Sequence, residues 1–254
     1  IYLPIVVLAI YAFNPSRLQA WPPVGFTVQW FFEAAANPSV VRAVLNSLTA
    51  ASVATLLALI LGTLAALAVQ RYEFFGRDFL DAVLDIPIVL PPLVVGLSLL
   101  ILFQFVPEYL RGFREAIVYQ IPAVIIAQFM VACAFAVRTM RATFDQMDSR
   151  REQVALTLGC TRAQAFGYVV LPEVQRGILT AGTLAWARAL GEFGPLLIFA
   201  GATRNKTEVL STTVFLELSI GNLEAAVAVS LIMVVSAVIV LIVARVWGTR
   251  ELEV

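Results

Sequence analysis

The chain has 254 residues, of which 61% are hydrophobic and 13% are charged, and its mean hydropathy is +0.91. Soluble globular domains are about a quarter charged, so this composition places most of the chain in a lipid bilayer. The net charge of zero argues against a nucleic-acid partner, which would require a clustered excess of Lys and Arg. Histidine is absent, which excludes histidine-dependent metal sites, Ser/His or Cys/His nucleophile pairs and histidine acid–base catalysis. Cys133 and Cys160 form neither a CxxC pair nor a disulfide framework, and no metal site is expected.

Segments that cross lipid must satisfy their backbone hydrogen bonds internally, so long apolar runs are expected to be helices. The first residues, IYLPIVVLAIYAF, are fewer than the roughly 20 that a spanning helix needs. We expect them to be the remaining part of a span whose start precedes Ile1. Five further runs qualify as spans: about 43–69, 80–106, 117–137, 177–200 and 225–244. The sequence therefore predicts an all-α, polytopic bundle of six transmembrane helices, with residues 1–254 forming one membrane domain.

The basic residues predict the orientation of these spans, because cytoplasmic loops collect Lys and Arg. One set of loops holds ten of them: Arg71, Arg77, Arg138, Arg141, Arg150, Arg151, Arg162, Arg176, Arg245 and Arg250. The alternate set holds six: Arg17, Arg42, Arg111, Arg114, Arg204 and Lys206. We therefore expect both termini and the connection 138–176 on the cytoplasmic side, and segments 14–38, 107–115 and 201–222 outside.

The cytoplasmic connection contains the stretch EQVALTLGCTRAQAFGYVVLP, residues 152–172. Glu152, Ala155 and Gly159 recur at steps of three and four, so a helix would place them on one narrow face that another surface can approach closely. Gly159 suits the end of that helix, where a left-handed residue is often required. A second amphipathic segment follows over 162–170, and we expect Pro172 to end it, because proline lacks an amide donor. The pattern predicts two short helices tied to the span that starts near residue 177.

This chain lacks the loop that binds nucleotide phosphates in many ATPases. Such a loop has the pattern GxxxxGK[ST], in which the lysine reaches the phosphates. The sole lysine is Lys206, which follows Asn205 and is expected outside. Any ATP-driven step must therefore take place in a partner chain.

The segment AWARALGEFGP places Arg188 and Glu192 within the fifth expected span. A charge at the centre of a membrane helix costs about 2.5 to 3.5 kcal/mol on insertion scales, so intramembrane charges are functional candidates by default. Four residues apart, the two would share a helical face, and they line a translocation path or fix the helix against its neighbours. Gly191 and Gly194 flank the glutamate and weaken the helix locally, as a gate requires.

The third expected span contains the segment DIPIVLPPLVVG. Pro87, Pro91 and Pro92 remove hydrogen-bond donors from the helix and are expected to bend it. A bent helix is more typical of the border of a cavity than of a straight packing element. Pro91 and Pro92 are therefore further candidates for the pathway or gate.

The spacing of residues 152–172 resembles the EAA loop of permease subunits in ATP-binding-cassette importers. Glu152, Val154 and Ala155 stand at the acidic and small positions, and Gly159 stands at the glycine. Val169, Leu171 and Pro172 match the closing hydrophobic-x-Leu-Pro. The resemblance implies that this loop inserts into a groove of a cytoplasmic ATPase, which would bind ATP and Mg while this chain binds no cofactor.

Two signatures narrow the resemblance to permeases for molybdate, tungstate and sulfate. PPLVVG contains Pro91, Pro92 and Gly96, and ARALGEFG contains Arg188, Gly191, Glu192 and Gly194. The implied assembly is a dimer of permease subunits, expected as a homodimer, with an ATPase dimer and an extracytoplasmic binding protein. That protein would deliver the oxyanion, molybdate or tungstate first and sulfate next, across a bacterial or archaeal cytoplasmic membrane. Segment 204–218 would meet it.

Three other readings remain open. An intramembrane hydrolase would need serine with histidine, or a pair of buried carboxylates, and the sequence offers neither. A stand-alone secondary transporter could use Arg188 and Glu192, but the loop 152–172 would then have no docking partner. A permease for a different small solute would keep the loop and change the cargo.

Overall fold

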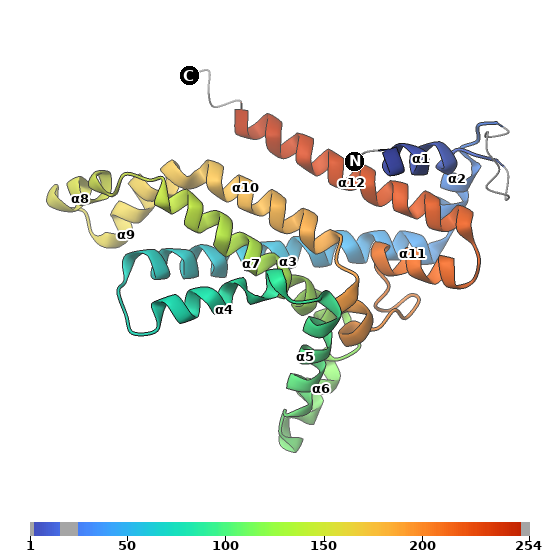
Figure 1. Cartoon of the computed structure of the whole chain (residues 1–254), viewed down its shortest axis with the longest axis horizontal. Helices are drawn as coiled ribbons and strands as arrows, with labels where there is room; N and C mark the ends of the chain where they lie inside the picture. The colour runs from blue at the N-terminus through green and yellow to red at the C-terminus, as the bar shows by residue number, and fades with distance from the viewer. Residues whose placement is uncertain (1–2, 16–24, 250–254) are drawn as a thin grey trace. The chain divides into compact units, whose positions relative to one another are not determined.

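Long apolar runs form helices because a helix pairs the backbone N–H and C=O groups within its own segment. The computed structural model describes residues 3–15 and 25–249, and within these residues it has helices and no strand, which confirms the all-α prediction (Figure 1). In chain order they are α1 (Leu3–Ala12), α2 (Gln29–Ala36), α3 (Pro38–Arg71), α4 (Arg77–Val89), α5 (Pro92–Gln104), η1 (Glu108–Leu110), α6 (Arg111–Ile117), α7 (Ile121–Asp145), α8 (Ser149–Thr157), α9 (Arg162–Ala165), η2 (Phe166–Val170), α10 (Leu171–Leu190), η3 (Leu196–Ala200), α11 (Leu210–Ser219) and α12 (Leu223–Thr249). The η1 segment is a 3₁₀ turn, whereas η2 and η3 are π-helical turns.

Three helices of the described chain are long and apolar enough to cross a bilayer: α3, α7 and α12. They correspond to the expected spans 43–69, 117–137 and 225–244. Helices α4 and α5 pass the same test only as a pair, which is bent by 115° at the break, so by length and composition the described residues contain three or four candidate spans. Helix α1 is apolar but has 10 residues. The prediction of a continuous span over 177–200 is wrong, because α10 ends at Leu190 where the glycine- and proline-rich segment begins.

The predicted outer loop 14–38 includes residues 16–24, which lie outside the described residues, as do residues 1–2 and 250–254. The described residues divide into two compact units. The first contains residues 3–15, 25–53, 91–128 and 190–240, and the second contains 54–90, 129–189 and 241–249. The single membrane domain expected from the sequence stays a prediction.

The second unit has a core in which small residues allow α3, α7 and α10 to approach closely. A Cβ added to Gly62 of α3 would lie 3.1 Å from the Cβ of Ala136, and one added to Gly182 of α10 would lie 3.1 Å from Leu59 Cδ1. Gly177 lies directly against Thr143. Around these contacts the core collects Ala66, Val137, Met140, Phe144, Val170, Val174 and Ala181. Close packing of this kind fixes the start of α10, and so the loop that precedes it.

In the first unit, the N-terminal part of α3 is tied to the segment before α11. Leu210 N–H donates to Ser47 Oγ at 2.7 Å, and Asn46 Nδ2 donates to Glu208 O at 3.0 Å. The Glu208 carboxylate is 1% exposed and accepts from the hydroxyls of Ser39 and Thr213. Neutral donors thus satisfy this buried carboxylate, as burial of a charge requires.

Candidate functional site

Helix α8 begins and ends with local hydrogen bonds that its sequence encodes. The Asp148 side chain accepts from the Arg150 N–H at 3.0 Å and caps the N-terminus. At the C-terminus, Gly159 N–H donates to Leu156 O and Cys160 N–H donates to Ala155 O, both at 3.1 Å. This pair of bonds is a Schellman motif, which needs a left-handed residue, and Gly159 has φ +93°. The role of Gly159 as the helix end is therefore confirmed.

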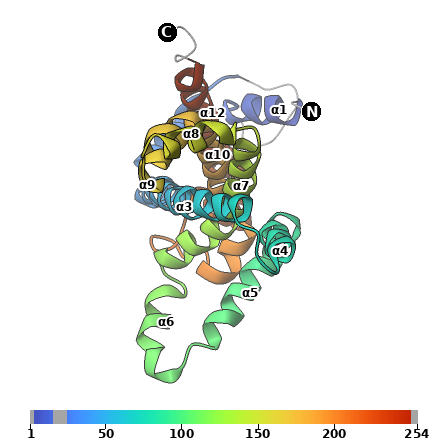
Figure 2. The same ribbon diagram turned by 90° about the vertical axis from the view of Figure 1, so that its left-hand side faces the viewer.

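Helix α9 starts two residues later with a capping box. The Gln164 N–H donates to Thr161 Oγ1 at 3.3 Å, and the Thr161 N–H donates to Gln164 Oε1 at 2.8 Å. Helices α8 and α9 and the turn η2 pack against one another, as Figure 2 shows. The expected pair of short helices is present.

The expectation that Pro172 ends the second segment is wrong. Pro172 is the second residue of α10, and Leu171 has helical angles of φ −60° and ψ −45°. The π-helical turn η2 explains the difference: its last bond joins the Leu171 N–H to Phe166 O, and α10 then starts anew. Proline is tolerated in the first turn of a helix because the amide there needs no intrahelical partner. Consequently α9, η2 and α10 follow one another without a loop.

The exposed face of α8 differs from the predicted one. Ala155 is 7% exposed, and the side chain of Glu152 is paired with Arg71 at the end of α3, so this face turns toward the second unit itself. Leu158 and Val154, four residues apart, are 80% and 55% exposed. No atom lies within 4 Å of where a Cβ on Gly159 would stand. The open surface of α8 includes Val154, Leu158 and Gly159, and the sequence pattern of small residues did not indicate the first two.

Two ion pairs, made by the adjacent residues Arg151 and Glu152, hold the N-terminal half of α8. Arg71 of α3 pairs with Glu152, and Arg151 Nη1 lies 3.1 Å from Glu173 Oε1 of α10. A pocket of about 520 Å³ lies beside the first pair and is lined by Gln70, Arg71, Tyr72, Phe144, Met147, Glu152, Gln153, Leu156 and Arg162. The loop is thus fastened to two helices rather than hanging from one. Val169 is half-buried and Leu171 is exposed, whereas Val170 between them is buried.

The two proline- and glycine-rich signatures meet in the first unit. Leu90 is extended and Pro91 and Pro92 start α5, so the predicted interruption of this run is present. A Cβ on Gly96 of α5 would lie 2.7 Å from Pro195 Cα. Reciprocally, a Cβ on Gly194 would lie 2.9 Å from Pro92 Cβ. Only glycine allows both approaches, so α5 and the segment before η3 form one closely packed pair.

The segment after α10 is irregular, and a hydrogen bond and an aromatic contact attach it to α11. Ser211 Oγ donates to Glu192 O at 2.7 Å, and the ring centroids of Phe193 and Phe215 lie 5.4 Å apart. The Glu192 residue is 2% exposed, whereas Gly191 is exposed. Since α10 ends at Leu190, the prediction that Arg188 and Glu192 share a helical face is wrong. The interruption by Gly191 and Gly194 takes Glu192 out of the helical register.

Arg188 lies in the last turn of α10. Its guanidinium carbon is 5.7 Å from the centroid of the Phe135 ring on α7. This distance is within the range of a cation–π contact, which stabilises an arginine in an apolar setting. Arg188 is half-buried, and this contact lies within the second unit.

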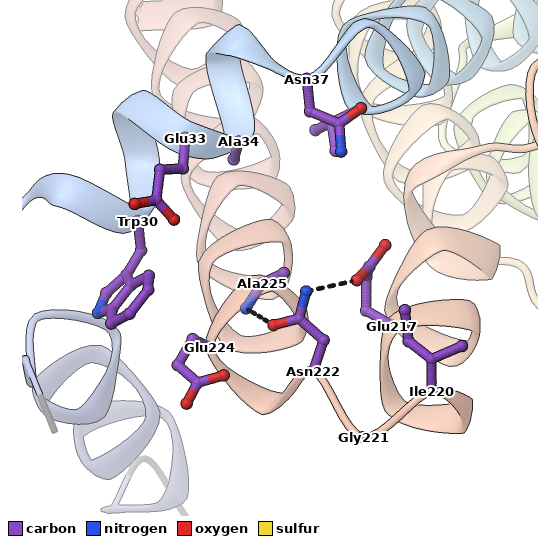
Figure 3. Close-up of a pocket in the computed structure, with 11 residues that line it drawn as sticks. Trp30, Glu33, Ala34, Asn37, Glu217, Ile220, Gly221, Asn222, Glu224 and Ala225 are labelled. Atoms are coloured by element: carbon purple, nitrogen blue, oxygen red, sulfur yellow. Dashed lines mark hydrogen bonds between the residues drawn. The ribbon is translucent and has the colours of Figure 1, made fainter. Parts of the chain in front are cut away.

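A pocket of about 560 Å³ lies in the first unit between α2, the end of α11 and the start of α12 (Figure 3). Its eleven described lining residues include no basic side chain; they are Trp30, Glu33, Ala34, Asn37, Val40, Glu217, Ile220, Gly221, Asn222, Glu224 and Ala225. The buried Glu217 accepts from Arg204 at 2.9 Å and from Asn222 at 2.8 Å. Trp30 Nε1 donates to Asn14 O at 2.9 Å. The wall of this pocket is acidic and firmly hydrogen-bonded.

Within the described residues there is no group of three or more Cys, Asp or Glu side chains placed to hold a metal ion. The described residues combine a loop held by ion pairs, a broken pair of apolar helices and a helix, α10, that ends at a glycine-rich segment.

Comparison with known proteins identifies the family. The model of the binding-protein-dependent transport system inner membrane component matches residues 58–250. The sulfate transport system permease protein CysT of Salmonella typhimurium is 35% identical over 242 residues, which cover 94% of this chain and 83% of that protein. The molybdenum transport system permease protein ModB of Mycobacterium bovis is 32% identical and covers 95% of this chain and 91% of its own length.

Solved structures agree on the fold. A bacterial ABC transporter that imports the acidic polysaccharide alginate superposes with a TM-score of 0.77 at 20% identity, over 100% of this chain and 91% of that one. The same transporter in complex with a periplasmic protein bound to an alginate pentasaccharide gives a TM-score of 0.76. The curated relatives are permeases, which are transport components rather than enzymes. The chain therefore belongs to the family of inner membrane components of binding-protein-dependent transport systems, as a multi-pass transport subunit.

Proposed function

We propose that this permease carries a tetrahedral oxyanion, molybdate, tungstate or sulfate, delivered by an extracytoplasmic binding protein. The observation that carries the proposal is the similarity to permeases named for sulfate and for molybdenum transport over more than nine-tenths of the chain. A relative from Pyrococcus furiosus is named for molybdate and tungstate. These anions share charge and shape, so one pathway suits all three.

Energy for transport comes from a partner ATPase dimer, which binds ATP and Mg. The loop formed by α8, α9 and η2 is the docking element. Its exposed residues Val154, Leu158 and Gly159 form an apolar surface, flat at the glycine, that can dock into a groove of the ATPase. Glu152 and Ala155 act on the inner side, where they fasten the loop to the chain.

The pathway or gate lies at the interrupted helices. The broken segments around Pro91 and Pro92 and around Gly191 and Gly194 change conformation more readily than continuous helices, because their backbone bonds are already interrupted. Glu192 lies inside one of these segments. Arg188 supplies the positive charge that an oxyanion meets in the membrane, since arginine forms strong, directional bonds with anionic oxygens.

Two permease subunits form the pathway together, as a homodimer, in a bacterial or archaeal cytoplasmic membrane. Both termini and the loop 138–176 face the cytoplasm, segments 14–38, 107–115 and 201–222 lie outside, and segment 204–218 meets the binding protein. The positive-inside bias of the loops supports this orientation. Most residues that line the acidic pocket of Figure 3 belong to segments 14–38 and 201–222, so the pocket is then expected on the outer side.

Uptake by reconstituted vesicles tests the function. The permease is reconstituted with the ATPase and the binding protein, and labelled sulfate and molybdate are supplied from the binding-protein side. We expect uptake that requires ATP inside and that unlabelled tungstate inhibits. Oxyanion uptake without nucleotide hydrolysis would instead indicate a stand-alone transporter, and ATP-driven uptake of another solute alone would refute the oxyanion assignment.

A further inference from the structure

Helix α3, which is bonded to α8 through Arg71 and Glu152, contains residues of both units: 38–53 belong to the first and 54–71 to the second. It runs from Pro38 to Arg71, 34 residues, which corresponds to about 51 Å at 1.5 Å per residue. Helix α10, the other helix paired with α8, stops at Leu190.

The Arg71 end of α3 is fastened to the docking loop. Arg71 pairs with Glu152 of α8, and the side chains are 27% and 13% exposed, so the pair is largely shielded from water. The preceding residue, Gln70, donates to Asp145 Oδ1 at 3.3 Å at the end of α7. A displacement of α8 therefore acts directly on the last turn of α3.

The Pro38 end of α3 is fastened to the segment 203–210. Ser47 Oγ accepts from the Leu210 N–H at 2.7 Å, and Arg42 Nη1 donates to Asn205 O at 3.2 Å. Ser39 and Asn46 add bonds to the carboxylate and the carbonyl of Glu208. Ser47 and Glu208 are 2% and 1% exposed, so the bonds from Leu210 N–H to Ser47 and from Ser39 to Glu208 are buried, where water cannot easily replace them.

The helix between these two ends has the composition of a stiff element. After Pro38 it contains no proline, and its single glycine, Gly62, lies against Ala136 and Val137. Sharp bends in helices occur at proline, at glycine–serine pairs and at π-bulges, and none of these interrupts α3. A rotation or shift imposed at Arg71 is therefore carried along the helix rather than absorbed by a bend.

We infer that α3 couples the ATPase-docking loop to the segment 203–210, with the Arg71–Glu152 pair as the joint between them. The inference rests on the proposed function, in which the loop binds the ATPase and the segment contacts the binding protein. In this arrangement Glu152 is a positioning residue: it pairs within its own chain and transmits the movement of α8. Binding of the outer protein and ATP turnover thereby influence each other through a continuous helix.

The test measures how strongly the binding protein stimulates ATPase activity in the reconstituted complex. In Arg71→Gln, we expect the ATPase to remain associated and the stimulation ratio to fall about 2- to 30-fold, the range of measured coupling effects of 0.5 to 2 kcal/mol. The exchanged pair, Arg71→Glu with Glu152→Arg, restores part of the ratio if the ion pair is the joint. Arg77→Gln removes a charge of the same kind from the start of α4 and serves as the matched control.

The opposite end of α3 gives a second readout. Ser47→Ala removes the acceptor of the Leu210 N–H and is expected to lower the same ratio. If α3 is the route, Arg71→Gln and Ser47→Ala together lower the ratio no further than the stronger single variant. Two results would overturn the inference. In one, the double variant lowers the stimulation ratio by the product of the two single effects; in the other, the Arg71→Gln complex is stimulated as strongly as the wild type. A wild-type complex that the binding protein does not stimulate overturns the proposed function as well, so the two failures are distinct.

Discussion

Replacement of Gly96 by alanine tests whether the two signatures pack as the structure shows. The added Cβ would lie 2.7 Å from Pro195 Cα and 2.9 Å from Pro195 O. Carbon atoms in contact prefer separations of about 3.5 to 4.0 Å, so α5 must move away by about 1 Å. The opposing atoms belong to the backbone of a proline, and no side-chain rotation can relieve the overlap.

The cost follows from this geometry. Overpacking of a close contact destabilises a protein by about 1 to 3 kcal/mol. A loss of that size shifts the equilibrium between packed and separated arrangements by about 5- to 150-fold. For a chain of this length it lowers the midpoint of thermal unfolding by about 2 to 12 °C.

Thermal unfolding of the purified permease in detergent, followed by tryptophan fluorescence, measures the shift. Gly112→Ala is the matched control, because Gly112 lies in the exposed helix α6 with no atom within 4 Å of an added Cβ. The control should be neutral or slightly stabilised, since alanine favours helix. A Gly96→Ala protein that unfolds at the control's temperature and transports normally would refute the packing argument.

Three further predictions concern the loop and the charged residue. Gly159→Trp should insert normally but lose the ATPase in a co-purification assay, whereas Gly159→Asn, which tolerates left-handed angles at a cost below about 1–2 kcal/mol, should retain it. Leu158→Asp should also weaken co-purification, because it places a charge on a side chain that is 80% exposed on the proposed docking surface; unchanged recovery of the ATPase would remove Leu158 from that surface. Arg188→Ala should reduce oxyanion uptake roughly tenfold or more, as expected for the loss of a hydrogen bond to a charged group, with Arg188→Lys less affected. Normal uptake in Arg188→Ala would reassign the arginine to packing against Phe135.

The sequence by itself determined the class of structure and the family. Apolar runs this long and this poor in charge predict helices, because a helix satisfies its backbone hydrogen bonds within its own segment. The spacing around Gly159 fixed the end of α8, because a left-handed position at that point has few residues that can occupy it. These features depend on residues that are close together in the chain, so the sequence alone predicts them.

Tertiary structure decided which faces are used. Sequence spacing placed Glu152 and Ala155 on one side of α8, but only packing against the second unit turned that side inward and left Val154 and Leu158 exposed. Pro172 was expected to end a helix, and the π turn before it allowed a helix to begin there instead. The contact of Gly96 with Pro195 joins residues 99 positions apart, and no local pattern specifies such a pairing. Periodicity gives the direction of a side chain around its own helix, whereas the partner it meets depends on how separate helices approach one another.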